Sequence, residues 1–217
     1  MAPSKFLMPL SAAVVLSWAL AAPQISRSQP RPTAAERETA RAMMQEGDEL
    51  SAQGDLRAAL VRYSAAHALV NLPTTALELA RTQAKVGQLV EARGLALEIS
   101  HGVPQKGEPE LFARARSAAA ELAEELAPRI PALRTEVHPK GASYSLTIDN
   151  AVVPKAAHAI AYRANPGVHL VVVSAPGYAT QRKEVKLLEN LTATLTVTLV
   201  PQVSQVSQGP QATSTSR

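Results

Sequence analysis

The stretch from Asn165 to Tyr178 constrains the fold of this chain more than any other segment. It reads Asn-Pro-Gly-Val-His-Leu-Val-Val-Val-Ser-Ala-Pro-Gly-Tyr. A Pro-Gly pair precedes a run of aliphatic residues, and a second Pro-Gly pair follows it. Proline followed by glycine at the centre of a turn favours type II geometry. The stretch therefore predicts a strand over residues 168–173 between two tight turns, apolar on both faces as in a central strand.

The residues around this stretch show the two-residue periodicity that is typical of strands. Apolar and polar side chains alternate over residues 143–149, 183–187 and 191–199, and threonines occupy the polar positions of the last segment. Such alternation indicates strands with one buried and one wet face. Residues 133–201 are therefore predicted to form a small antiparallel β-sandwich.

Three motifs of this region, Asn165-Pro-Gly-Val-His169, the valine-rich strand and Pro-Gly-Tyr178, resemble the PEGA domain, a small β-sandwich of bacterial envelope and surface proteins. Asn150 stands where that family usually has the glycine of an Asp-Gly turn. Asp149 and Asn150 can still adopt the positive φ angles of a tight hairpin. The family has no known catalytic role, so the resemblance implies architecture and a spacer or envelope-binding module.

Residues 34–127 are rich in alanine and follow the helical period. Thr33 with Glu36 has the pattern of a capping box, and glycines and prolines mark the helix ends. The predicted helices run from residues 34 to 53, 56 to 70, 73 to 86, 88 to 100 and 108 to 127, the last ending before Pro128.

The helical part contains an internal repeat. Gly54-Asp-Leu56-Arg-Ala-Ala59 aligns with Gly87-Gln-Leu89-Val-Glu-Ala92 at an offset of 33 residues. Paired helices at this period are typical of helical repeat arrays. The pattern resembles tetratricopeptide repeats, although Glu46 and Gln83 stand where that family usually has apolar or aromatic residues. The resemblance implies an all-α domain of two degenerate helical hairpins, with the fifth helix as a cap.

In tetratricopeptide proteins the first helix of each pair lines a concave groove that holds an extended peptide or a partner protein. The resemblance implies that this groove is faced by Arg41, Met44, Asp48, Ser51, Thr74, Leu77, Arg81 and Lys85. The charged members, Arg41, Asp48, Arg81 and Lys85, are the candidate partner-binding residues. The alternative is that these side chains form an ordinary solvated helix face.

The first 22 residues have the pattern of a secretory signal peptide. Lys5 precedes an apolar run that ends in Ala19-Leu-Ala21, a small-residue cleavage site. The alternative is an uncleaved anchor, for which the apolar run is short. Residues 23–33 are predicted to be a linker and residues 202–217 a disordered tail. The mature chain, without a membrane span, is expected in the periplasm or at the cell surface.

No catalytic constellation is recognisable in the sequence. The chain has no cysteine, which excludes disulfides and thiolate metal sites. Its five histidines lack metal-ligand spacing, and there is no phosphate loop or serine-nucleophile elbow. His169 is interpreted as a structural residue that bridges to the turn backbone. We therefore expect no enzymatic activity, no metal and no cofactor.

Charge distinguishes the two halves of the chain. Residues 34–126 carry ten basic and fourteen acidic side chains, whereas residues 127–217 carry nine basic and four acidic ones. The net charge of the chain is too small to argue for nucleic acid. The sequence favours an exported, non-catalytic envelope protein that binds a protein or peptide through its helices. The alternative is a structural protein that associates with cell-wall or surface polymer through its basic half.

Overall fold

The computed structural model describes residues 31–202, and the described residues from Pro32 onward belong to one compact unit. Three predictions concern other residues. The signal peptide over residues 1–22, the linker over residues 23–33 apart from its last three residues, and the tail over residues 202–217 apart from Gln202 lie outside the described part of the chain.

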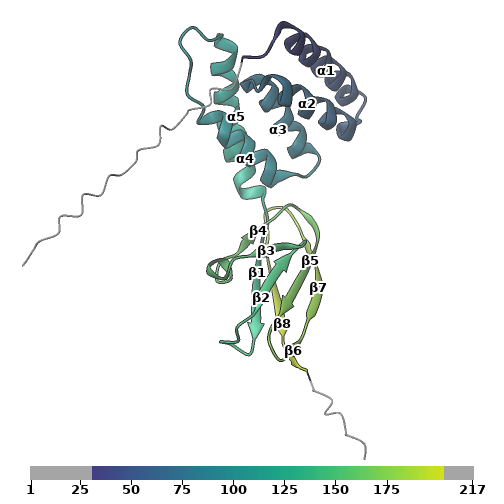
Figure 1. Ribbon diagram of the computed structural model, residues 1–217, viewed down its shortest axis with the longest axis vertical. Helices are drawn as coiled ribbons and strands as arrows, with labels where there is room; N and C mark the ends of the chain where they lie inside the picture. The colour runs from purple at the N-terminus through teal and green to yellow at the C-terminus, as the bar shows by residue number, and fades with distance from the viewer. Residues whose placement is uncertain (1–30, 203–217) are drawn as a thin grey trace, which may run out of the picture. The chain divides into compact units, whose positions relative to one another are not determined.

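Between residues 31 and 202 the chain is α+β in two parts, five α-helices followed by strands (Figure 1). The helices are α1 Ala34–Ala52, α2 Leu56–Val70, α3 Pro73–Lys85, α4 Leu89–Ser100 and α5 Glu110–Arg129. Each consecutive pair packs together, and α3 also packs against α5. Every predicted helix is present, with ends within about two residues of the prediction.

Local signals account for the helix starts. The Thr33 hydroxyl accepts a hydrogen bond from the Glu36 N–H, and the Glu36 carboxylate accepts from the Thr33 N–H, which confirms the capping box. The Asp55 carboxylate accepts from the Ala58 N–H at 3.0 Å. These bonds satisfy backbone N–H groups of the first helical turn that have no partner within the helix.

The predicted end of the fifth helix before Pro128 is wrong, because α5 continues through this proline to Arg129. Proline removes one N–H donor, but the ladder resumes beyond it, since the Ile130 N–H donates to the Leu126 carbonyl at 3.2 Å. Only Ile130 and Pro131 then separate α5 from the first strand.

Small side chains let the helices approach closely. Ala59, Ala66, Ala92 and Ala96 are fully buried. At Gly47 a β-carbon would lie 2.6 Å from the Tyr63 ring, closer than atoms in contact can come. The small residues that recur in the sequence therefore have a packing role, because they occupy the places where neighbouring helices touch.

The second part contains nine strands and one short 3-10 helix within residues 132–201 (Figure 1). The strands are β1 Ala132–His138, β2 Ser145–Ile148, β3 Ala151–Val153, β4 Tyr162–Arg163, β5 Gly167–Ser174, β6 Tyr178–Ala179, β7 Gln181–Leu187, β8 Thr192–Thr198 and β9 Val200–Pro201, with the 3-10 helix at Lys155–Ala157. In this range they form sheets with the orders β4-β1-β8, β3-β2-β5-β7 and β6-β9.

The prediction of an antiparallel β domain is wrong for one pair, because β1 and β8 run parallel in register from Ala132 opposite Thr192 to His138 opposite Thr198. The remaining strand pairs in residues 132–201 are antiparallel. Side-chain alternation indicates which face of a strand is buried, but it does not indicate whether the neighbouring strand is parallel or antiparallel. β1 and β8 are far apart in the chain, so the long connection that a parallel pair needs is available.

The three-stranded and the four-stranded sheets share one hydrophobic core. Leu133 and Val197 come from the first sheet, and Leu146, Val173 and Leu187 from the second. All five side chains are at most 3 % exposed. The inward positions predicted from alternation in β2, β7 and β8 are thereby confirmed.

Two details of the predicted strands are wrong. Leu191 was expected inside but is exposed, since it precedes the start of β8. β5 does lie between β2 and β7, yet only one of its faces is buried in the described structure. Val168 is 63 % exposed on the other face.

Two of the three predicted turns have the geometry that their residues indicate. Asp149 and Asn150 have φ angles of 48° and 68°, as the predicted tight hairpin between β2 and β3 requires. Gly177 has a φ of 77°, and the Tyr178 N–H donates to the Ala175 carbonyl, as in the predicted type II turn. Gly167 differs, because its φ of 141° is outside the type II range and it already belongs to β5.

Candidate functional site

The surface formed by α1, α3 and α5 carries two neighbouring hollows that share Arg81. The first has a volume of about 370 Å³ and is also lined by Met44, Thr74, Leu77, Glu78, Leu111, Arg114, Ala115 and Ala118. The second has a volume of about 280 Å³ and is also lined by Ala84, Lys85, Leu122, Glu125 and Arg129. We call the two hollows together the α1/α3/α5 groove.

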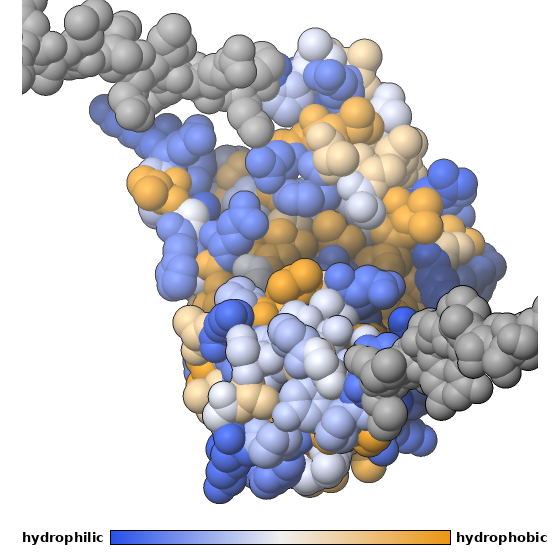
Figure 2. All heavy atoms as spheres, turned by 60° about the horizontal axis from the view of Figure 1, so that its bottom comes forward, coloured by the Kyte–Doolittle hydropathy of each residue, from blue (hydrophilic) through white to orange (hydrophobic). Residues whose placement is uncertain are grey.

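The groove has a hydrophobic floor and a polar rim. Leu77, Ala84 and Ala115 are buried at its base, whereas the Leu111 side chain is 60 % exposed. Figure 2 shows one face of the molecule, on which hydrophobic side chains gather in a hollowed area bordered by hydrophilic ones. A concave surface of this composition can bury apolar groups of a partner while its rim forms hydrogen bonds.

Most of the arginines at the rim are paired with carboxylates of their own helix. Arg81 contacts Glu78 at 2.7 Å, and Arg114 contacts Glu110 at 2.7 Å. Lys85 has no ion-pair partner within residues 31–202. Arg81 and Arg114 therefore already contact carboxylates of the protein, whereas Lys85 contributes a cation that a partner can pair with.

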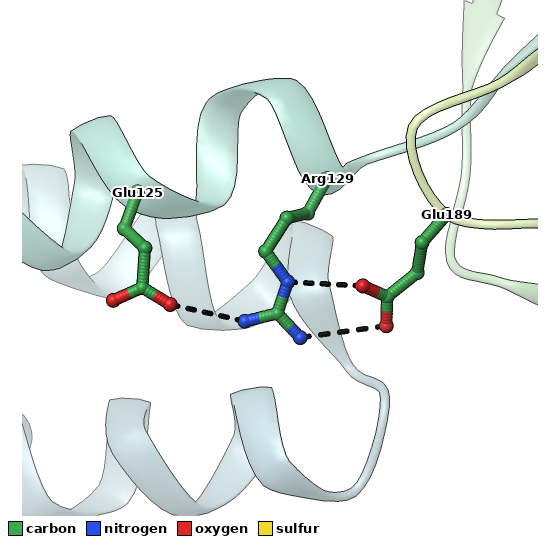
Figure 3. A network of polar contacts seen from close by, with 3 residues as sticks. All are labelled: Glu125, Arg129 and Glu189. Atoms are coloured by element: carbon green, nitrogen blue, oxygen red, sulfur yellow. Dashed lines mark hydrogen bonds and ion pairs between the residues drawn. The ribbon is translucent and has the colours of Figure 1, made fainter.

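A third arginine connects one end of the groove to the β part (Figure 3). Arg129 Nε lies 2.9 Å from Glu189 Oε2, and its Nη2 lies 3.4 Å from Glu189 Oε1. Its Nη1 donates to Glu125 Oε1 at 3.1 Å. The hydrogen bond to Glu189, which follows β7, is the main reason that the pKa of Arg129 is raised above its usual value. The groove therefore reaches the helix end that contacts the β part.

The structure brings some of the predicted groove residues together. Arg81 and Lys85 line the groove, as do Met44, Thr74 and Leu77.

The other predicted residues lie elsewhere. Arg41 forms an exposed ion pair with Glu38 and lines neither hollow. Asp48 accepts a hydrogen bond from the Tyr63 hydroxyl at 2.7 Å, so it joins α1 to α2. Burial and this hydrogen bond raise the pKa of Tyr63. Ser51 lines neither hollow. Arg41 and Asp48 are therefore not part of the groove as the structure defines it.

Sequence reasoning missed the contribution of α5. Leu111, Arg114, Ala118, Leu122 and Arg129 line the groove from this helix, which was expected only to cap the stack. These residues recur at intervals of three, four or seven, so they share one face of a helix. The available signal was the order of the helices. Because α5 follows two helical hairpins, in a regular array it would stand beside α1 and α3, the first helices of those hairpins.

Another hollow, of about 260 Å³, lies where α2, α3, α4 and α5 meet the loop before α5. Its wall includes a nearly buried ion pair between Arg116 and Glu108. His67 also lines it, and burial lowers the pKa of this imidazole, although Glu98 opposes the effect.

Two features are absent from residues 31–202. No group of three or more His, Asp or Glu side chains there is arranged to hold a metal ion. None of the described helices combines the length and hydrophobicity needed to cross a membrane.

The chain matches no protein-family model, and no curated protein matches it significantly.

Proposed function

We propose that this chain is an exported, non-catalytic protein of the cell envelope whose α1/α3/α5 groove binds a segment of a protein partner. The observation that carries the proposal is the groove itself, in which three helices present a hydrophobic floor and a rim of arginines and Lys85. Export is supported by the signal-peptide pattern of residues 1–22.

The dimensions of the groove suit a short peptide segment. Thr74 and Lys85 mark its two ends along α3, and eleven residues of helix rise about 16 Å. An extended chain covers that distance in about five residues. Apolar side chains of the segment would lie on Leu77 and Ala115, and its polar groups would face the rim.

The architecture supports the same proposal. In our interpretation α1 with α2 and α3 with α4 are degenerate tetratricopeptide-like hairpins, and α5 is the first helix of an incomplete third pair. The small residues at the helix contacts and the 33-residue repeat support this interpretation. The β part is a PEGA-like module that acts as a spacer or an envelope-binding element.

Charge reversal tests the groove. Protein purified with Lys85→Glu and Arg81→Glu should capture less of a crosslinked partner from the envelope fraction than the unaltered chain, because the rim loses two cations and gains two anions. Lys140→Glu is the control, since Lys140 is exposed in the turn after β1 and lines neither hollow. Equal capture by the groove variant and the control, with both folded, would count against the proposal.

A second candidate function is association with cell-wall or surface polymer through the β part. The observation in its favour is that β7, the edge strand of its sheet, carries three exposed cations, Arg182 and Lys186 on one face and Lys183 on the other. The full chain should then pellet with purified cell wall at low salt and remain in solution at high salt. Pelleting that Lys183→Glu with Lys186→Glu leaves unchanged would remove this candidate.

A further inference from the structure

Asn165, in the connection between β4 and β5, caps a helix from which it is far away in the sequence. Its Oδ1 accepts a hydrogen bond from the Val90 N–H at 2.8 Å, and its Nδ2 donates to Glu91 Oε2 at 2.7 Å. The residue at the N-cap position of α4, Gln88, makes no side-chain cap bond. The first N–H groups of a helix have no partner inside the helix. Asn165 therefore supplies the missing cap and joins the β part to α4.

The position of Asn165 is held by His169. The side chain of His169 is 11 % exposed, and its Nε2 lies 2.7 Å from the Asn165 carbonyl oxygen. Its Nδ1 lies 2.5 Å from Asp149 Oδ2. Asp149 Oδ1 in turn accepts from the Leu170 N–H at 2.9 Å. The result is a continuous chain of hydrogen bonds from the β2–β3 turn to the N-terminus of α4.

The donors and acceptors in this series of hydrogen bonds specify where the protons lie. A carbonyl oxygen only accepts, so Nε2 of His169 carries a proton. An ionised carboxylate also only accepts, so Nδ1 carries one as well. Burial favours the neutral form of Asp149, but hydrogen bonds from His169 and from the Leu170 N–H outweigh it and hold its pKa below the usual value. The geometry therefore fits a doubly protonated, cationic His169 against an ionised Asp149.

We propose that Asp149, His169 and Asn165 form a pH-dependent latch that holds the β part to α4 while both nitrogens of His169 are protonated. The ionised Asp149 carboxylate retains the proton on Nδ1, so the ring loses the proton on Nε2 to solvent. The lone pairs of Nε2 and of the Asn165 carbonyl oxygen then face each other across 2.7 Å. The hydrogen bond that holds the Asn165 carbonyl is lost, and the cap on α4 is weakened. The latch is independent of what the groove binds.

The other charged groups around the latch are few in the described structure. On β7, Val185 pairs with His169, and Lys183 lies two residues away on the same face. On α4, Glu91 is reached through the Asn165 side chain. Asp149 is the charged group in direct contact with the ring, so its carboxylate determines which ring nitrogen keeps a proton.

The exchange of the Val90 amide hydrogen with solvent, followed by NMR on the full chain, tests the latch. After correction for intrinsic exchange, the protection of Val90 should be about fivefold lower at pH 8.0 than at pH 5.5, the effect of losing one net hydrogen bond. The Ala58 amide is the matched control, since the Asp55 carboxylate of its own segment caps it.

Two variants distinguish the latch from a general loosening of the contact between the β part and α4. Asn165→Ala should remove Val90 protection at both pH values. Asp149→Asn should raise Val90 protection at pH 8.0 above that of the unaltered chain. Its amide can accept from the Leu170 N–H and donate to Nδ1 of a neutral ring, and asparagine tolerates the positive φ of this position.

The outcomes are decisive in either direction. Protection of Val90 that falls with pH, and that Asp149→Asn restores, would support the latch. Protection that is equal at pH 5.5 and 8.0 in the unaltered chain, or that Asp149→Asn fails to raise at pH 8.0, would overturn it. Ring ¹⁵N shifts showing that only one nitrogen of His169 is protonated at pH 5.5 would also overturn it.

Discussion

The helical part and the β part are stabilised in opposite ways. The helices touch through residues with little or no side chain, such as Ala59, Ala96 and Gly47, so their contacts are crowded. The β part is filled by branched aliphatic side chains such as Leu187 and Val171. A crowded contact is damaged by added atoms, whereas a filled core is damaged by removed atoms. The two parts should therefore respond differently to the same kind of substitution.

The largest expected effect is truncation in the β core. Leu187→Ala should reduce the free energy of unfolding by about 2–5 kcal/mol, because it removes a side chain that is 1 % exposed and leaves a cavity. Urea denaturation followed by circular dichroism measures the change. A loss no greater than that from Leu188→Ala, whose side chain is 52 % exposed, would mean that the filled core does not dominate the β part.

The next effect is enlargement in the helical part. Gly47→Ala should lower the free energy of unfolding by about 1–3 kcal/mol, since the new β-carbon would lie 2.6 Å from the Tyr63 ring. Tyr63 is buried and its hydroxyl donates a hydrogen bond to Asp48, so its ring cannot move freely away from the added β-carbon.

Gly94→Ala is the matched control, because no atom lies within 4 Å of its added β-carbon. Alanine is the better helix former, so this variant should gain about 0.5–1 kcal/mol. If both alanine variants were stabilised equally, close helix contact at Gly47 would not be a feature of the fold.

A smaller effect is expected where the two parts meet. Asn165→Ala should cost about 1 kcal/mol, the usual value of a helix cap, although the cap comes from the β part. Asp55→Ala, which removes the local cap of α2, provides the comparison. Scanning calorimetry distinguishes the outcomes, since loosened docking of the parts should broaden the transition only for Asn165→Ala. Identical transitions for the two variants would argue that Asn165 has no role between the parts.

The smallest expected effect is a dependence of the folding stability on pH in the acid range. The folded pKa of Asp149 is lower than its usual value, so its ionised form contributes stability above about pH 4. That contribution is lost as the pH falls through the folded pKa. Asp149→Asn should therefore be less stable than the unaltered chain at pH 5.5, and the difference should shrink at pH 3. A difference that grows towards pH 3 would have the wrong sign.

The sequence predicted local features well and long-range features poorly. Helix starts at Thr33 and Asp55 and the hairpin at Asp149 depend on residues within a few positions of each other. The parallel pairing of β1 with β8 and the cap that Asn165 places on α4 join residues far apart in the chain. No local pattern encodes such contacts, because each strand or loop alone is compatible with several partners.

The candidate site shows the same division. Arg81 and Lys85 were predicted from their positions in the repeat, as the resemblance to tetratricopeptide repeats implies, and both line the groove. Arg41 and Asp48 lie on α1, where a different contact, the hydrogen bond from Tyr63 to Asp48, orients the helix. The contribution of α5 was missed because its place depends on how the whole array stacks.

The central claim, that the α1/α3/α5 groove holds a protein segment, is tested most directly by site-specific photo-crosslinking. A benzoyl-phenylalanine at position 111, on the groove rim, is compared with one at position 61 on α2. Leu111 and Val61 are 60 % and 63 % exposed, but Val61 lines neither hollow. The account predicts a discrete adduct in the envelope fraction from position 111 that Lys85→Glu weakens, and none from position 61. The same adducts from both positions, or none from position 111, would contradict it.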